Sequence, residues 1–245
     1  MPDHIRRWRE TGDKEHLFNF YRREEYGRIY AKPRRKWSRK LQLLAELMQI
    51  GPDETVLDVG CASKILKQFV EERGGSYKGL DIAGGFDPDY LCDAEDMSLI
   101  GDDEFDWVVL ADVLEHLPHP ELAIREAFRV GRKVIAVLPN WYRLERIRFL
   151  PRDPGDRHIT RKHPSGWIDD FRSAGFCITH LRGFHYAPSV AFIPVLPLRA
   201  VDHFFRLKPF DRISACVDER FADKRLIRFL GQEIIVVAGK HDRES

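Results

Sequence analysis

An apolar stretch that runs into a tight turn constrains this chain more than any other feature. Residues 55–59 (TVLDV) are typical of a buried strand, Gly60 begins a turn of small residues, and a helical pattern follows from Ile65. In a parallel α/β sheet, ligands lie at the carboxyl ends of the strands, where this turn would sit. Glycine lets a ligand approach the backbone, and the amides that open the helix can donate to it. The stretch therefore predicts a site for a nucleotide-like cofactor.

An acidic residue further along narrows the kind of ligand. Asp81 follows the predicted strand 76–80, about twenty residues beyond the glycine turn, where a carboxylate can accept both hydroxyls of a ribose. The dinucleotide pattern G-x-G-x-x-G is not met, because Ala62 and Ile65 stand where its later glycines belong, and no P-loop pattern occurs. A nucleoside without a pyrophosphate fits better.

Four motifs extend this prediction: VLDVGC at 56–61, GLD at 79–81, CDAEDM at 92–97 and FDWVVLADVLEHL at 105–117. In order and spacing they resemble the class I S-adenosylmethionine-dependent methyltransferases, over roughly residues 40–140. The resemblance implies S-adenosylmethionine as the cofactor. It also implies an α/β, Rossmann-like three-layer sandwich, with a seven-stranded, mostly parallel sheet. Its antiparallel last strand, 233–238, would insert between the fifth and sixth strands.

The resemblance also assigns residues to the cofactor. It implies that Asp93 accepts from the adenine amine and that the Ala94 amide donates to the ring, although a turn-forming role is open for Asp93. The full predicted set is Asp58, Gly60, Cys61, Ala62, Lys64, Asp81, Ile82, Asp93, Ala94, Ala111 and Asp112. Ala62 and Lys64 replace later glycines of the family's turn. Lys64 could pair with the cofactor carboxylate, pair with Asp58 or Asp81, or lie in solvent, and weak or lost cofactor binding is a further alternative.

His116 is the candidate catalytic base. Methyl transfer from a sulfonium is an in-line displacement, so a base is needed only if the acceptor must lose a proton. An imidazole titrates near neutrality, and His158 and His163 are the next choices; a structural role is the alternative for each. Some relatives that act on quinone-type phenols bind a divalent metal in this element, and Asp112, Glu115 and His116 would share a face if it were helical. Because Leu-Glu-His-Leu is common in members without a metal, we expect none.

The 245 residues, 43% of them hydrophobic, suffice for a single methyltransferase domain. We expect a helical cover at 1–50, a cofactor-binding half at 51–140 and an acceptor-side half at 141–245. Aromatic or basic side chains of the cover could touch the cofactor or simply pack the helix (Tyr21, Tyr26, Arg28). Four cysteines without a C-x-x-C pair, and no signal peptide or membrane-spanning run, favour a cytoplasmic protein.

The excursion 184–228 is the least family-like segment. Three prolines interrupt its apolar run 186–198, and a basic amphipathic stretch follows. The part 186–210 could form a substrate lid, a homodimer contact, a peripheral membrane foot or a plain packed excursion. We expect methyl transfer to a small-molecule, glycan or lipid-linked acceptor. A catalytically weak or nonenzymatic relative stays open, as does an RNA methyltransferase, although the nucleic-acid signal is not strong.

Overall fold

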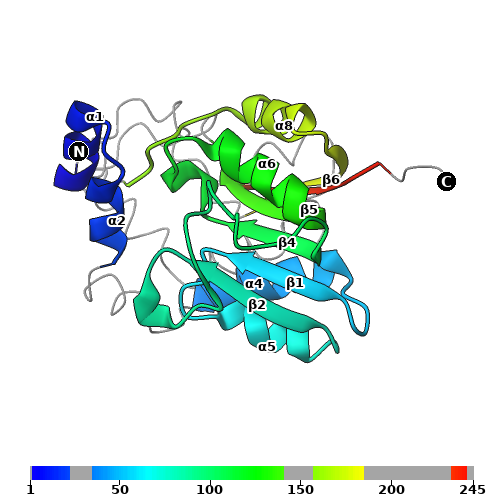
Figure 1. The fold of residues 1–245 in the computed structure, drawn as a ribbon. Coiled ribbons are helices and arrows are strands. Elements are labelled where there is room, and N and C mark those ends of the chain that lie inside the picture. Colours follow the sequence, from blue (N-terminus) through cyan, green and yellow to red (C-terminus); the bar gives the residue numbers. More distant parts are fainter. Residues whose placement is uncertain (1, 23–34, 141–156, 185–232, 242–245) are drawn as a thin grey trace, which may run out of the picture.

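The computed structural model describes residues 2–22, 35–140, 157–184 and 233–241, which build one mixed sheet with helices on both faces (Figure 1). The seven strands lie in the order β3-β2-β1-β4-β5-β7-β6. Strands β1 to β5 pair in parallel, whereas β7 is antiparallel to both β5 and β6. This confirms the predicted fold, with the last strand inserted between the fifth and sixth. The strands are Thr55–Val59 (β1), Ser76–Asp81 (β2), Tyr90–Leu91 (β3), Phe105–Ala111 (β4), Gly131–Pro139 (β5), Cys177–Phe184 (β6) and Glu233–Gly239 (β7).

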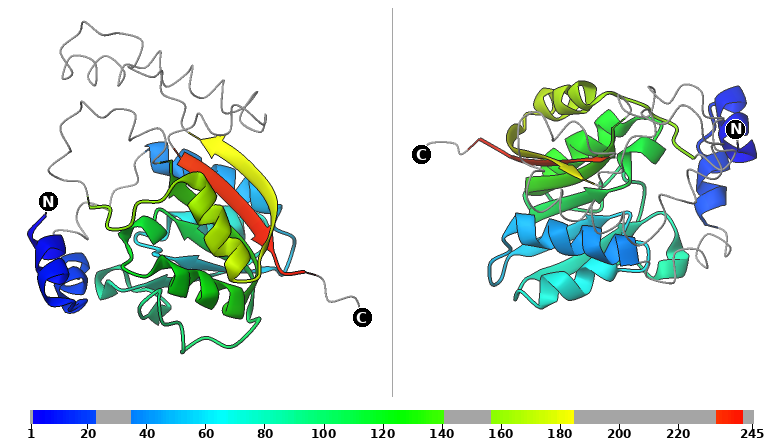
Figure 2. Two further views of the ribbon diagram at one scale, coloured as in Figure 1. Left: turned by 90° about the horizontal axis from the view of Figure 1, so that it is seen from above. Right: turned by 180° about the vertical axis from the view of Figure 1, so that it is seen from behind.

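Helices cover the two faces of the sheet (Figures 1 and 2). Helices α4 (Arg35–Met48) and α5 (Ile65–Glu71) lie on one face, and α6 (Pro120–Val130) and α8 (Pro164–Ser173) lie on the other. Successive side chains of a strand point to opposite faces. Accordingly Val56 and Val109 join the core under α4 and α5, whereas Leu57 and Val108 join the core under α6 and α8. The central strands therefore have nearly continuous apolar sequences because both faces are buried.

Two short helices lie at one end of the sheet, apart from its faces (Figure 1). They are α1 (Asp3–Thr11) and α2 (Glu15–Tyr21). Ile5 and Leu17 pack together with Ile159, so the N-terminal helices rest on the segment that precedes α8. Gly12 ends α1 in a left-handed conformation, with φ 73°, and its amide donates to the Trp8 carbonyl at 2.7 Å. Within 1–50, where a helical cover is predicted, the described residues form α1, α2 and α4.

The third strand, β3, is only two residues long. The Asp89 carboxylate accepts a hydrogen bond from the Gly79 amide at 2.9 Å, so backbone pairing begins only at Tyr90. Strands β5 and β6 extend to Pro139 and Phe184, because their pairing with β7 continues to these residues. Several predicted features lie outside the described residues: Tyr26, Arg28, the loop after β5 and the excursion beyond Phe184. Within the described part, no helix is both long and apolar enough to cross a bilayer.

Candidate active site

The turn after β1 depends on a glycine. Gly60 has φ 71°, and its amide and that of Cys61 donate to the Leu80 carbonyl at 2.8 and 3.0 Å. A Cβ atom on Gly60 would lie 2.7 Å from Cγ2 of Val113, well inside van der Waals contact. Because Val113 follows β4, this glycine allows the ends of two neighbouring strands to approach each other.

Two residues that replace later glycines of the turn still adopt a glycine-like backbone. Ala62 and Lys64 have φ values of 42° and 53°, in the left-handed region that costs a non-glycine residue roughly 1–2 kcal/mol. The Lys64 ammonium donates to the backbone carbonyl of Asp87. That partner was not among the predicted ones. Lys64 therefore ties the turn to the loop after β2.

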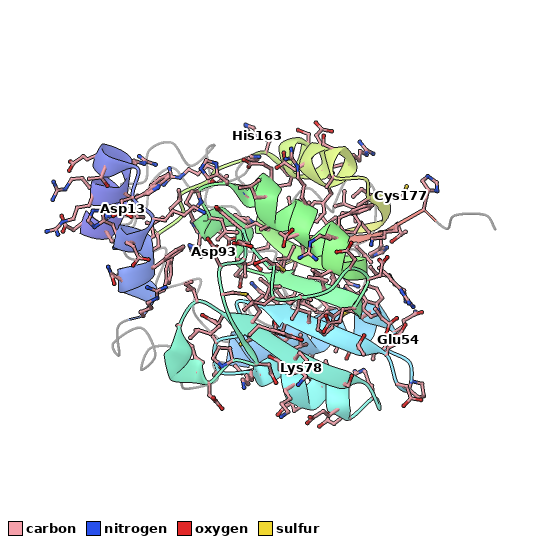
Figure 3. The ribbon with its side chains drawn as sticks, in the orientation of Figure 1. Asp13, Glu54, Lys78, Asp93, His163 and Cys177 are labelled. Carbon is pink, nitrogen blue, oxygen red and sulfur yellow. The ribbon has the colours of Figure 1, made fainter. Side chains whose placement is uncertain are left out.

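A cavity lies at the carboxyl ends of β1, β2 and β4, with α2 as its outer wall. It encloses about 730 Å³, the part open to solvent included. Residues from both the predicted cofactor set and the N-terminal helices line it. From the predicted set these are Gly60, Asp81, Ile82, Asp93, Ala94, Asp112 and His116. The lining does not include Asp58, Cys61, Ala62, Lys64 or Ala111. Figure 3 shows Asp93 on the side of the sheet that faces α1 and α2, far from Glu54.

Asp81 stands at the end of β2 with its carboxylate held by backbone amides. One oxygen accepts from the Ala62 amide at 2.9 Å and the other accepts from the Ala83 amide at 2.8 Å. Burial raises the pKa of Asp81, and these amide hydrogen bonds oppose the rise. Each carboxylate oxygen has a second lone pair, so Asp81 can still accept from the two hydroxyls of a ribose.

Asp93 and Glu95 form an acidic pair after β3, and a lysine from the N-terminal segment covers it. The Lys14 ammonium lies 3.2 Å from Asp93 and also forms an ion pair with the nearly buried Glu95. The Asp93 carboxylate accepts from the Glu95 amide at 2.9 Å, and Glu95 accepts from the His119 amide at 2.7 Å. Lys14 therefore fastens the segment before α2 to the predicted adenine end of the cavity.

Asp58 is buried beneath the turn rather than exposed in the cavity. The Tyr77 hydroxyl donates to its carboxylate at 2.8 Å. Burial raises the pKa of Asp58 to about 7, against the effect of the Tyr77 hydrogen bond. This geometry supports the turn from below.

Asp112 adopts a left-handed conformation, with φ 58°, directly after β4. Its carboxylate pairs with the buried ammonium of Lys40 from α4, which also pairs with Glu233 of β7 at 2.8 Å. The next residues form a single 3₁₀ turn, η2 (Leu114–His116), rather than an α-helix. Asp112 is therefore not in helical register with Glu115 and His116, as one predicted arrangement required.

His116 lies in the cavity wall against the segment that leads to α8. Its Nδ1 lies 3.3 Å from the Arg157 carbonyl, and its ring stacks on that of His158 with centroids 5.1 Å apart. Burial and the neighbouring His158 lower the pKa of His116 to about 4. Glu115 is buried beside them, and one atom each of Glu115, His116 and His158 lie within 4.8 Å of one another. Such a group could hold a cation.

Several residues of the cavity were not predicted from the sequence. They are Lys14, Leu17, Phe18, Leu80, Cys92, Glu95, Val113, Leu117 and Pro118. Lys14 reaches Glu95 across 81 positions of the chain, and no local pattern signals such a pair. Glu95 and Leu117 lie inside the motifs at 92–97 and 105–117, so the sequence could have indicated that they lie near the site. Tyr21, named as a residue that could touch the cofactor, does line the cavity.

The residues present fit S-adenosylmethionine. The carboxylate at the end of β2 suits a ribose, and the Asp93–Ala94 pair suits an adenine. Gly60, which also lines the cavity, presents backbone without a side chain to the remainder of the molecule. Asp112 and His116 line the same cavity.

Comparisons with known proteins agree with this geometry. A family model described as a methyltransferase domain matches residues 26–181. The ubiquinone biosynthesis O-methyltransferase of Pseudomonas paraeruginosa is 34% identical over 164 residues, which covers 55% of this chain and 69% of that protein. The enzyme of the same name from Pseudomonas fluorescens is 28% identical over 162 residues, covering 54% and 68%.

Solved structures show the same fold. A methyltransferase from Archaeoglobus fulgidus superposes with a TM-score of 0.57 at 18% identity, covering 88% of this chain and 98% of that one. Magnesium protoporphyrin IX methyltransferase from Synechocystis PCC 6803, solved with bound SAH, has a TM-score of 0.56 at 16% identity. The match covers 93% of this chain and 100% of that one.

Proposed function

Because this chain belongs to the class I S-adenosylmethionine-dependent methyltransferases, we propose that it methylates a hydroxyl group of a small, mostly apolar acceptor. The observation that carries this proposal is His116, an imidazole in the wall of the cofactor cavity among apolar side chains. Tyr21, Val113 and Leu117 line the same part of the cavity and suit a ring or an alkyl chain. The names of the two Pseudomonas relatives support an O-methyl product.

The tautomer of His116 supports its role as a base. The Arg157 carbonyl can only accept, so the contact at 3.3 Å requires the hydrogen on Nδ1 and leaves the lone pair on Nε2. Because burial lowers its pKa to about 4, the ring is neutral at physiological pH and can accept a proton. A hydroxyl that loses its proton to Nε2 becomes the stronger nucleophile.

The other residues of the cavity would bind the cofactor and orient the acceptor. S-adenosylmethionine, when bound, supplies a methyl group on a sulfonium. Asp81 would accept from the ribose hydroxyls, while Asp93 and the Ala94 amide would bind the adenine. Residues of α2 form the outer wall of the cavity, which would limit the access of water and help to position the acceptor for in-line attack. Alignment then supplies much of the rate, with His116 removing the proton.

A direct assay tests this proposal. Purified protein would be incubated with S-adenosylmethionine and a panel of catechols, aromatic amines and carbon acids, and products would be identified by mass spectrometry. We expect an O-methylated catechol and release of S-adenosylhomocysteine. Methylation of amines alone, or calorimetric binding of the cofactor without transfer to any hydroxyl, would overturn the proposal.

Substitution of His116 tests whether this residue is the base. His116→Asn should lower kcat by about 10²–10⁴-fold, because the proton has no acceptor, while the Kd for S-adenosylhomocysteine stays within about threefold. His119→Asn is the matched control, since His119 is three residues away with its side chain 56% exposed. Equal losses in both variants would contradict a catalytic His116. Membrane contact through 186–210 and a homodimer stay predictions.

A further inference from the structure

A short segment after the fifth strand is fastened to η2, directly beside His116. The amides of Ile159 and Thr160 both donate to the Glu115 carbonyl, at 2.8 and 3.0 Å, and the Thr160 hydroxyl donates to the Leu117 carbonyl at 2.8 Å. Together with the contact between His116 and the Arg157 carbonyl, these bonds determine where His158 stands. His158 is thus positioned by backbone hydrogen bonds against the candidate base.

The buried carboxyl group of Glu115 completes this arrangement. Its Oε1 lies 3.9 Å from Nε2 of His158, and its Oε2 is buried without a hydrogen bond from any residue that the structure describes. One atom from each of the three side chains lies within 4.8 Å of the other two. A water at equal distance from the three atoms would lie about 2.8 Å or less from each, which is hydrogen-bonding distance. The His158 side chain is 31% exposed, whereas that of Glu115 is 3% exposed. His158 therefore gives this group a route to solvent outside the buried Glu115.

We infer that Glu115, His116 and His158 act as one proton-accepting unit, in which His158 and Glu115 receive the proton that His116 takes from the acceptor hydroxyl. The inference rests on the proposed function. His116 takes the proton as the acceptor oxygen gains the methyl group and the methyl–sulfur bond breaks. The products are the methyl ether, S-adenosylhomocysteine and one proton on the protein, which leaves through His158 to water. His158 and Glu115 are positioning residues in this scheme.

Electrostatics favour a single proton on the two rings. Stacked imidazoles 5.1 Å apart repel each other when both are charged, and this repulsion contributes to the lowered pKa of His116. Among the residues that the structure describes, the other charged or titratable groups around His116 include Asp112, Glu115, Arg157 and Tyr21. Burial and the nearby Asp112 raise the pKa of Glu115 well above its usual value, so its carboxylate has a higher proton affinity than an exposed one.

The first test is an NMR titration of His116 in the resting protein, which needs no acceptor. His158→Phe keeps a ring of similar shape but removes the second imidazole, and the pKa of His116 should rise by about one unit. His119→Phe is the control and should leave the titration unchanged. A His116 titration that is the same in the His158→Phe protein and the wild type would overturn the inference.

The second test is the pH dependence of kcat with the catechol acceptor. His158→Phe and Glu115→Gln should each lower kcat about 10-fold or more at pH 7.5 and move the acidic limb of the profile, with KM for the acceptor within about threefold. Thermal melts identify a variant that has lost its fold. If His158→Phe does not fold, His158→Gln replaces it. Unchanged kcat in folded variants, or activity lost to a chelator and restored by Mg²⁺, would overturn the inference. No O-methylation by the wild type, with the NMR shift present, would instead refute the proposed function.

Discussion

The ammonium of Lys40 lies 2.8 and 2.7 Å from the two carboxylate oxygens of Asp112, although these residues are 72 positions apart. The same ammonium lies 2.8 Å from Glu233, so it joins α4, the end of β4 and the start of β7. Burial lowers the pKa of Lys40, but the two carboxylates outweigh it and raise the pKa above its ordinary value. Asp112 is therefore held at the cavity wall by a charge that is itself buried.

Removal of this charge should destabilise the fold. Lys40→Met leaves Asp112 and Glu233 facing each other without a cation. Breaking a fully buried pair costs about 3–5 kcal/mol, and because the Asp112 side chain is 39% exposed we expect about 2–3 kcal/mol. Urea unfolding measures this. Lys67→Met, which removes an exposed pair with Glu71, is the control and should cost less than about 0.5 kcal/mol.

Substitution of the turn glycine should abolish tight cofactor binding. In Gly60→Ala the new Cβ atom would lie 2.7 Å from Val113, so the cavity wall must shift. We expect at least a tenfold weaker Kd for S-adenosylhomocysteine by calorimetry, about 1.4 kcal/mol or more. Gly12→Ala is the matched control, since it has a similar φ of 73° and no atom within 4 Å of its Cβ position. If both variants bind equally well, the close approach at Gly60 is irrelevant.

Lys64 should contribute little to cofactor affinity. Its ammonium is bound to the Asp87 carbonyl and it does not line the cavity. Lys64→Gly also removes the strain of a non-glycine residue in the left-handed region, about 1 kcal/mol. This gain offsets the lost hydrogen bond. The Kd for S-adenosylhomocysteine should change by less than about threefold. A tenfold loss would show that Lys64 is recruited to hold the cofactor, and a tenfold gain would show that it is a handicap.

Lys14 should control how firmly the N-terminal helices close the cavity. Lys14→Met removes the ion pairs with Asp93 and Glu95, and Glu95 is then left buried without its cation. We expect about tenfold weaker binding of S-adenosylhomocysteine and faster proteolytic cleavage within residues 2–22. Arg6→Met, on the exposed surface of α1, should change neither. Identical proteolysis of Lys14→Met and wild type would contradict the proposed fastening.

Asp58 should make stability decrease as the pH rises. Its pKa is about 7 in the folded state and 3.8 in the unfolded chain, so between these values the folded state binds more protons. This contribution is complete below pH 3.8 and is lost as the pH rises through 7, at most about 1.4 kcal/mol per pH unit. Asp58→Asn should flatten the free energy of unfolding between pH 4.5 and 7. The exposed Asp96→Asn should keep the wild-type slope, and an unchanged slope in Asp58→Asn would refute the assignment.

Much of this protein was determined by local sequence. Uninterrupted apolar runs such as 107–111 favour buried central strands, and Gly60 marks the turn because its φ is unavailable to other residues at low cost. Chain order and the spacing of the acidic residues placed Asp81 and Asp93 at the same sheet edge. These features depend on a few neighbouring residues, which is why the sequence alone predicted the fold and the meeting of Asp81 and Asp93 in one cavity.

Only the tertiary structure decided how the site is closed and charged. Lys14 meets Glu95, Lys40 meets Asp112, and His158 meets His116 across long stretches of chain, and no periodicity encodes such encounters. Whether Lys64 faces the cofactor or the Asp87 carbonyl likewise depends on where the loop after β2 lies. Long charged side chains place their charges well away from the backbone, so their partners follow from packing rather than from sequence spacing.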